Sequence, residues 1–133
     1  MNVGDIIAER TVQLTRESLV RYAGASGDFN PIHYRDDVAA EVGLPGVLAH
    51  GMLTMGVASS VALAELPNAA RVLDYGVRFA RPVVVDPITG AELSITAKVG
   101  AVDDTAVRID LTVKHADTTV LVKAQLRVAA DSL

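Results

Sequence analysis

The sequence lacks cysteine altogether and has only three histidines among its 133 residues. Without cysteine there are no disulfides, no thiolate metal sites and no cysteine nucleophile. Neither H-x3-H nor HExxH occurs, so the usual spacings of a zinc site are missing as well. Lysines and arginines form no run, and the formal net charge is −4. We therefore expect no metal, no nucleic acid partner and no binding to a membrane surface.

Two further features are missing from the sequence. The N-terminus carries acidic residues and has no basic segment followed by an apolar one, which argues against a signal peptide and favours a cytoplasmic protein. An uncharged run over residues 51–64 is shorter than the roughly 20 residues of a membrane-spanning helix. The length fits one domain over residues 1–133.

The second half of the chain shows the pattern of β-strands. Apolar and polar residues alternate over 71–79, 91–99, 107–113 and 122–128. A period of two predicts strands with one buried and one wet face, as in an antiparallel sheet. The segments DPITG, VDD and HADTT separate these strands as turns.

The first half of the chain shows helical patterns. Thr15 is expected to cap a helix that Gly24 ends, and Asp36 or Asp37 is expected to cap a second, short helix. A long helix over about 52–66 is apolar on nearly all its faces, so it should be wrapped on most sides. These elements predict an α+β domain in which an antiparallel sheet curls around one long helix.

The stretch SGDFNPIH, residues 26–33, is the first candidate for chemistry. Pro31 removes a backbone donor and biases Asn30 away from helical angles, which predicts a rigid, extended crossing between two helices. The spacing would let Asp28 and His33 converge on one point. A second candidate is AHGM at the start of the long helix, where the N–H of Gly51 is free to bind an oxygen.

A carboxylate, an imidazole and a helix N-terminal N–H are the groups needed to add or remove water beside a thioester carbonyl. Each also has an ordinary structural explanation. Asp28 and Asn30 could simply form Asx turns, and His50 could be a helix-entry residue satisfied by the backbone. Spacing alone leaves both interpretations open.

The segments YAGASGDFNPIH and GVLAHGML resemble the signature of the MaoC-like (R)-specific enoyl-CoA hydratases and (3R)-hydroxyacyl-ACP dehydratases. The resemblance extends over nearly the whole chain. It is strongest to the catalytic, beta-type subunit of the heterodimeric (3R)-hydroxyacyl-ACP dehydratases of actinobacterial fatty acid elongation. This resemblance implies the hot dog fold, with a short helical overhang that carries the active-site loop.

The resemblance also implies the chemistry and the residues that perform it. The reaction would be a reversible hydration of a trans-2-enoyl thioester to the (3R)-hydroxyacyl thioester, without metal or redox cofactor. Asp28 and His33 match the catalytic dyad, and Gly51 matches the glycine whose backbone N–H binds the thioester oxygen. Asn30 and His50 match residues that support the loop.

Substrate carrier and assembly are less defined. The thioester would be carried by CoA or acyl carrier protein, and Arg78 and Arg81 are candidates to contact carrier phosphate unless they are merely solvated. The resemblance implies a homodimer, or a heterodimer with another hot dog chain, joined edge to edge. Gly56 replaces a serine found in some members, which puts substrate positioning in doubt. An acyl thioesterase and a non-catalytic acyl-binding partner subunit are the alternative functions.

Overall fold

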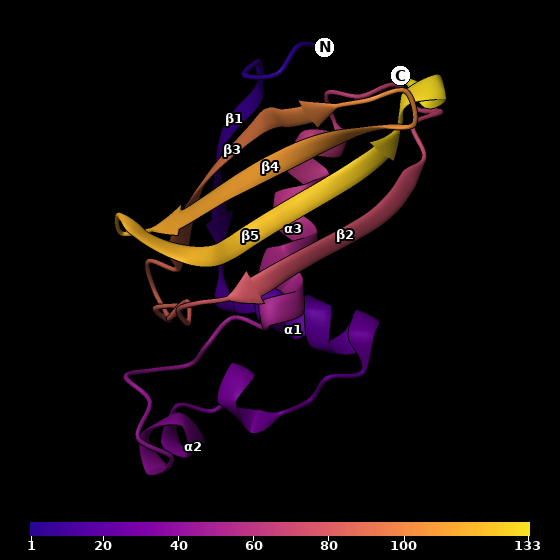
Figure 1. Cartoon of the computed structure of the whole chain (residues 1–133). Helices are drawn as coiled ribbons and strands as arrows, with labels where there is room; N and C mark the ends of the chain where they lie inside the picture. The colour runs from indigo at the N-terminus through magenta and orange to yellow at the C-terminus, as the bar shows by residue number, and fades with distance from the viewer.

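A computed structural model describes all residues, 1–133, and shows a five-stranded antiparallel sheet lying across one long helix (Figure 1). The strand order is β1-β3-β4-β5-β2. The elements in chain order are β1 (Ile6–Leu14), α1 (Arg16–Ser26), a 3₁₀ turn (Pro31–His33), α2 (Asp36–Glu41), α3 (Gly51–Leu63), β2 (Val72–Phe79), β3 (Ala91–Val102), β4 (Ala106–His115), β5 (Thr118–Ala129) and a second 3₁₀ turn (Ala130–Ser132). None of the helices has the length and apolar character needed to cross a membrane.

The overhang, residues 27–50, connects α1 to α3 and contains the first 3₁₀ turn and α2. In Figure 1 it extends from the end of the sheet opposite to both chain termini. Residues 47–49 tie it to the segment after β2, because Val47 accepts a hydrogen bond from Val85 and Ala49 donates one to Val83. The overhang is therefore attached through its last residues to the segment that follows β2.

The central strands confirm the alternation predicted from the sequence. Leu93, Ile95, Ala97 and Val99 of β3 are all buried, and every second residue of β4 faces the same core. That core lies between the sheet and α3, which packs against β1, β3 and β4. Burial of these apolar side chains is the main source of stability.

Strand β1 was not predicted from the sequence. Its inward residues are Ala8 and Leu14, which are buried, and Val12, which is half-buried. The exposed Arg10 interrupts this alternation, so the period of two is visible only in part. Arg10 instead forms an ion pair with Glu65 after α3, and β1 forms one edge of the sheet.

The predicted burial of Val122 is wrong, because β5 contains a bulge. Lys123 has a left-handed φ of 51°, and the pairing of β5 with both β4 and β2 shifts at this point. An extra residue in a strand changes which side chains face the core. Val120 and Leu121 are therefore buried, whereas Val122 is 39% exposed.

Two predicted helix boundaries need correction. Helix α1 begins after Thr15, as predicted, with a capping box to Ser18, but it continues past Gly24 and ends at Gly27 with a φ of 78°. Helix α2 has Arg35 at its N-cap, and Asp36 lies in the first turn with no capping hydrogen bond from a side chain. An acidic residue is favourable in the first turn as well as at the N-cap, because both positions lie near the positive end of the helix dipole.

Helix α3 is buried or half-buried over most of its surface, as predicted. Thr54, Ala58, Val61 and Ala62 face the core, and a line of residues on the helix stays exposed: Met52, Gly56, Ser60 and Ala64. After Met52, the helix residues outside this line are all buried or half-buried. Tyr75 of β2 donates a hydrogen bond of 2.7 Å to the carbonyl of Met55, which fixes the edge strand to the helix.

Candidate functional site

The backbone around Asp28 is shaped by side-chain hydrogen bonds. Asp28 Oδ1 accepts the N–H of Asn30 at 3.1 Å, and Asn30 Oδ1 accepts the N–H of Ile32 at 3.2 Å, which starts the 3₁₀ turn at Pro31. These are the Asx turns considered from the sequence. They engage only one oxygen of Asp28, so its second oxygen is free for another contact.

The imidazole of His33 is held in one orientation. Its Nδ1 lies 2.7 Å from the carbonyl oxygen of Leu48. A carbonyl can only accept, so Nδ1 carries the hydrogen and, in the neutral ring, Nε2 keeps a free lone pair. Only 9% of His33 is exposed, and a proton acceptor is therefore fixed in a nearly buried position.

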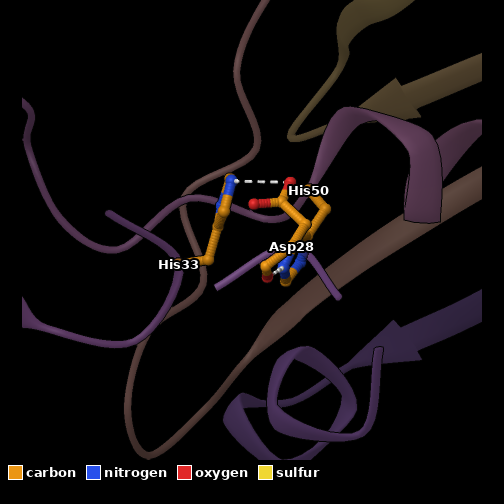
Figure 2. Close-up of side chains that lie close together, drawn as sticks. All are labelled: Asp28, His33 and His50. Carbon is orange, nitrogen blue, oxygen red and sulfur yellow. Dashed lines mark hydrogen bonds and ion pairs between the residues drawn. The ribbon is translucent and has the colours of Figure 1, made fainter. Parts of the chain in front are cut away.

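Asp28 and His33 converge, as their spacing predicted (Figure 2). Asp28 Oδ2 lies 3.9 Å from His33 Nε2, and the Asp28 side chain is half exposed. This distance is too long for a direct hydrogen bond. It is short enough for one water oxygen to contact both groups, so the pair is suited to hold a water and exchange protons with it.

His50 packs against both partners of this pair. Its ring stacks on His33 with centroids 3.9 Å apart and an interplanar angle of 22°, and the edge of Tyr22 lies on it at 4.7 Å. Its Nε2 donates to the carbonyl oxygen of Asp28 at 3.2 Å, and its buried Nδ1 has no partner. Burial lowers the pKa of His50 below its usual value. A neutral His50 therefore joins the Asp28 backbone to the His33 ring.

The three side chains form a poor metal site. Nitrogen and oxygen atoms of Asp28, His33 and His50 come within 4.8 Å of one another. A histidine lone pair lies in the plane of its ring, and the two rings are stacked, so their lone pairs lie in nearly parallel planes. They do not converge on one ion as tetrahedral coordination requires.

Gly51 lines a cavity of about 330 Å³. His33, Thr54, Phe79 and Arg81 also line it, together with Val120 and Leu121 of β5. Gly51 is the first residue of α3, and its N–H forms no hydrogen bond within the chain. A Cβ at Gly51 would lie 2.9 Å from the ring of Phe79, so the lack of a side chain keeps this N–H accessible.

The predicted phosphate contacts lie at the end of β2. Arg81 lines the cavity, whereas Arg78 does not, and both side chains are exposed. All other arginines of the chain form an ion pair with a carboxylate: Arg10, Arg16, Arg21, Arg35, Arg71, Arg108 and Arg127. Arg81, which lines the cavity, and Arg78, which does not, are thus the arginines with no carboxylate partner.

Sequence reasoning missed several residues of this site, among them Leu48, Thr54 and Phe79. Leu48 orients His33 through its carbonyl, and a backbone contact leaves no signal in the residue type. Phe79 is 55% exposed and lines the cavity. The alternation over 71–79 predicted that Leu73 and Phe79 face the core, and this is wrong, because both are about half exposed on the edge strand β2. Gly56, exposed on α3, does not line the cavity.

Comparison with known proteins places the site in a family context. Residues 4–120 match the family model described as MaoC like domain. Over 79 residues the chain is 39% identical to the 3-hydroxyacyl-thioester dehydratase X of Mycobacterium tuberculosis. The aligned segment covers 59% of this chain and 27% of that protein. The chain also spans less than two thirds of the other curated relatives that it matches.

Solved structures share the whole architecture. A MaoC-like dehydratase superposes with a TM-score of 0.90 and 34% identity, covering 97% of this chain and 40% of that one. The R-hydratase PhaJ1 of Pseudomonas aeruginosa superposes with a TM-score of 0.84 and 28% identity, covering 98% and 82%. The predicted hot dog fold is confirmed by these superpositions.

Proposed function

Since the chain belongs to the MaoC-like family, we propose that it catalyses the reversible hydration of a trans-2-enoyl thioester to the (3R)-hydroxyacyl thioester. The observation that carries this proposal is the pairing of Asp28 with a His33 whose tautomer is fixed. The names of the M. tuberculosis dehydratase and of PhaJ1 point to the same chemistry in those proteins. Fatty acid metabolism is the context in which such thioesters occur.

The geometry suggests a role for each member of the dyad. A water held between Asp28 Oδ2 and His33 Nε2 loses a proton to the imidazole while its oxygen adds to C3 of the enoyl group. The carboxylic form of Asp28 supplies a proton to C2, and the proton on His33 then returns to Asp28 to restore the starting state. Dehydration runs through the same steps in reverse.

The remaining site residues support this chemistry. The free N–H of Gly51 binds the thioester oxygen, where negative charge develops as the enolate forms. Asn30 fixes the start of the 3₁₀ turn, and His50 links the backbone of Asp28 to the ring of His33. We assign both a supporting role, because Asn30 Oδ1 and His50 Nε2 are already engaged with backbone groups.

Arg81 and Arg78 are proposed to contact the phosphate of the carrier, CoA or acyl carrier protein. The support is their lack of a carboxylate partner beside the cavity, where a guanidinium remains available to a phosphate. Arg81→Gln should raise KM a few-fold and leave kcat nearly unchanged, because a phosphate contact on the carrier binds the ground state and the transition state equally. The control is Arg71→Gln, because Arg71 is paired with Asp131.

We further propose that the free edge of β2 pairs with a second hot dog chain. This edge exposes Val72, Leu73 and Phe79, and Val122 lies beside it on β5. Unpaired edges with apolar side chains invite strand pairing. Because Phe79 also lines the cavity, the second chain would complete the acyl tunnel. It could be another copy or a different subunit.

The hydration assignment is tested with crotonyl-CoA. The purified protein should remove the enoyl absorbance and produce 3-hydroxybutyryl-CoA of the R configuration, as shown by chiral analysis. A thiol-trapping reagent added in parallel separates this reaction from that of a thioesterase, which releases free CoA. Release of thiol without loss of the enoyl group would favour the thioesterase over the hydratase.

The assembly is tested by light scattering across a dilution series, with activity measured on short and long enoyl thioesters. A dimer that is active on short substrates and weak on long ones would indicate that a different subunit shapes the tunnel. Strong activity on long substrates would show that a homodimer suffices. A fully active monomer would contradict the proposed pairing at β2.

A further inference from the structure

Thr54 carries a hydroxyl that nothing in the protein satisfies. The residue is only 3% exposed, and its backbone N–H belongs to the helix, donating to the carbonyl of His50. Its side chain takes part in no hydrogen bond. By contrast, Ser59 and Ser60 on the same helix donate their hydroxyls to the carbonyl of Gly56. A buried hydroxyl without a partner is costly unless a ligand supplies one.

The Thr54 hydroxyl can be reached from the cavity. In the buried and half-buried residues, one side-chain polar atom is both shielded from solvent and without a hydrogen-bond partner, and that atom is Nδ1 of His50. The unpartnered Thr54 hydroxyl is therefore not fully enclosed. Since Thr54 lines the cavity and is otherwise buried, the space that its hydroxyl contacts is the cavity itself.

Thr54 also lies beside the free N–H of Gly51. The two residues are three positions apart in the first turn of α3, so they share one face of the helix. Helical side chains point toward the N-terminus and lie over the preceding turn. The side chain of Thr54 thus lies over the turn that begins at Gly51.

We propose that the Thr54 hydroxyl is a second hydrogen-bond donor to the thioester carbonyl oxygen, acting together with the Gly51 N–H. This inference rests on the proposed function, because it assumes a thioester in the cavity. Two donors at one oxygen stabilise the developing enolate more than the ground-state carbonyl, since their hydrogen bonds strengthen as charge accumulates. The acyl carbonyl is thereby fixed by α3, while the overhang supplies the dyad.

Thr54→Val tests this donor, because valine keeps the shape and removes only the hydroxyl. We expect kcat on crotonyl-CoA to fall roughly tenfold or more, with a smaller change in KM. Thr54→Ser, which keeps the hydroxyl, should stay near wild type. The stability of Thr54→Val should not fall, because the hydroxyl has no partner in the chain. Ser60→Ala is the matched control, since it removes a hydroxyl of α3 outside the site.

A spectroscopic measurement separates this inference from the proposed reaction. Butyryl-CoA labelled with ¹³C at the carbonyl is saturated and cannot be hydrated, so its bound carbonyl stretching band reports hydrogen bonding alone. The band should lie at lower frequency in wild type and Thr54→Ser than in Thr54→Val. A Thr54-dependent band in a protein that does not hydrate crotonyl-CoA would contradict the function and support the donor. An unchanged band, or a kcat of Thr54→Val within twofold of wild type, would overturn the donor.

Discussion

The overhang and the sheet are each stabilised by a different kind of interaction. In the sheet, backbone pairing joins five strands, and buried aliphatic residues such as Ile95 and Ile109 fill the space against α3. In the overhang, polar side chains hold the backbone: Asp28 and Asn30 cap successive turns, and His50 and His33 bond to main-chain carbonyls. The sheet is stabilised mainly by apolar burial, whereas the overhang combines a few buried apolar residues, Ala39, Val47 and Ala49, with specific polar contacts.

The residues that stabilise the sheet are therefore largely different from the residues that would carry out the reaction. The polar residues of the overhang are largely the ones that the reaction would use, whereas the core residues of β3 and β4, and Leu126 of β5, do not line the cavity. Substitutions in the overhang should therefore change activity more than stability, and substitutions in the core should do the opposite. Each of the following experiments tests this separation.

The largest effect on activity is expected at the dyad. Asp28→Asn and His33→Ala should each lower the hydration rate by roughly 100-fold or more, the usual scale for a lost general acid or base. The double variant should cost far less than the product of the two losses, because the groups act as one unit. Steady-state rates on crotonyl-CoA and denaturant unfolding curves measure both sides of the comparison. Fully active, normally folded single variants would disprove the assignment of the dyad.

The converse effect is expected in the core. Leu126 of β5 is 1% exposed, and Leu126→Ala should lower the free energy of unfolding by about 2–5 kcal/mol through the lost burial and the cavity left behind. Activity per folded molecule should stay near wild type at low temperature, because Leu126 does not line the substrate cavity. A specific activity that fell as much as that of the dyad variants would show that the two regions are not separable.

Gly51→Val should fall between these two cases. The new side chain would crowd the ring of Phe79, which is exposed and can move, so the unfolding midpoint should change little. Activity should drop by about tenfold or more, because access to a backbone oxyanion donor is obstructed. If both substrate affinity and turnover survived in this variant, the thioester oxygen would have to bind elsewhere.

The smallest effect concerns the pH dependence of stability. Because the pKa of His50 is lowered in the folded state, the unfolded chain takes up the proton first as the pH falls through about 6.5. The contribution of His50 to the free energy of unfolding is therefore complete above that pH. It is lost progressively as the pH falls from there to the pKa of His50 in the folded state. His50→Gln, which retains an N–H donor, should remove this part of the dependence, whereas His115→Gln should not. Identical unfolding profiles for wild type and His50→Gln between pH 5 and 7 would contradict the buried, neutral state of His50.

The regular parts of the fold could be predicted because a two-sided strand repeats its pattern over many residues. Leu93 to Val99 show this repeat without interruption, and β3 was found correctly. Strand β1 was missed because Arg10 breaks the alternation, and the burial of Val122 was predicted wrongly because the bulge at Lys123 is a local backbone conformation. No residue type identifies that bulge, since lysine is not usual at a positive φ.

The site was only partly predictable for a similar reason. The convergence of Asp28 and His33 follows from a short, rigid segment around Pro31, which sequence spacing can describe. The contacts of His33 with the Leu48 carbonyl and the His50 ring depend on how the end of the overhang folds back over its beginning. Such packing is set in three dimensions, and no periodicity records it. The catalytic roles of these residues stay predictions.

The strand order has a consequence for how quickly the site can form. β2 is the second strand in the chain, yet its one partner in the sheet is β5, the last strand, and the cavity requires residues from α3, from the end of β2 and from β5. Such pairings between distant segments have high contact order and form slowly. During synthesis, β2 has no strand to pair with until residues 118–129 have left the ribosome. We therefore expect catalytic competence to be among the last properties that a folding chain acquires, after the sheet formed by β3 and β4 is already in place.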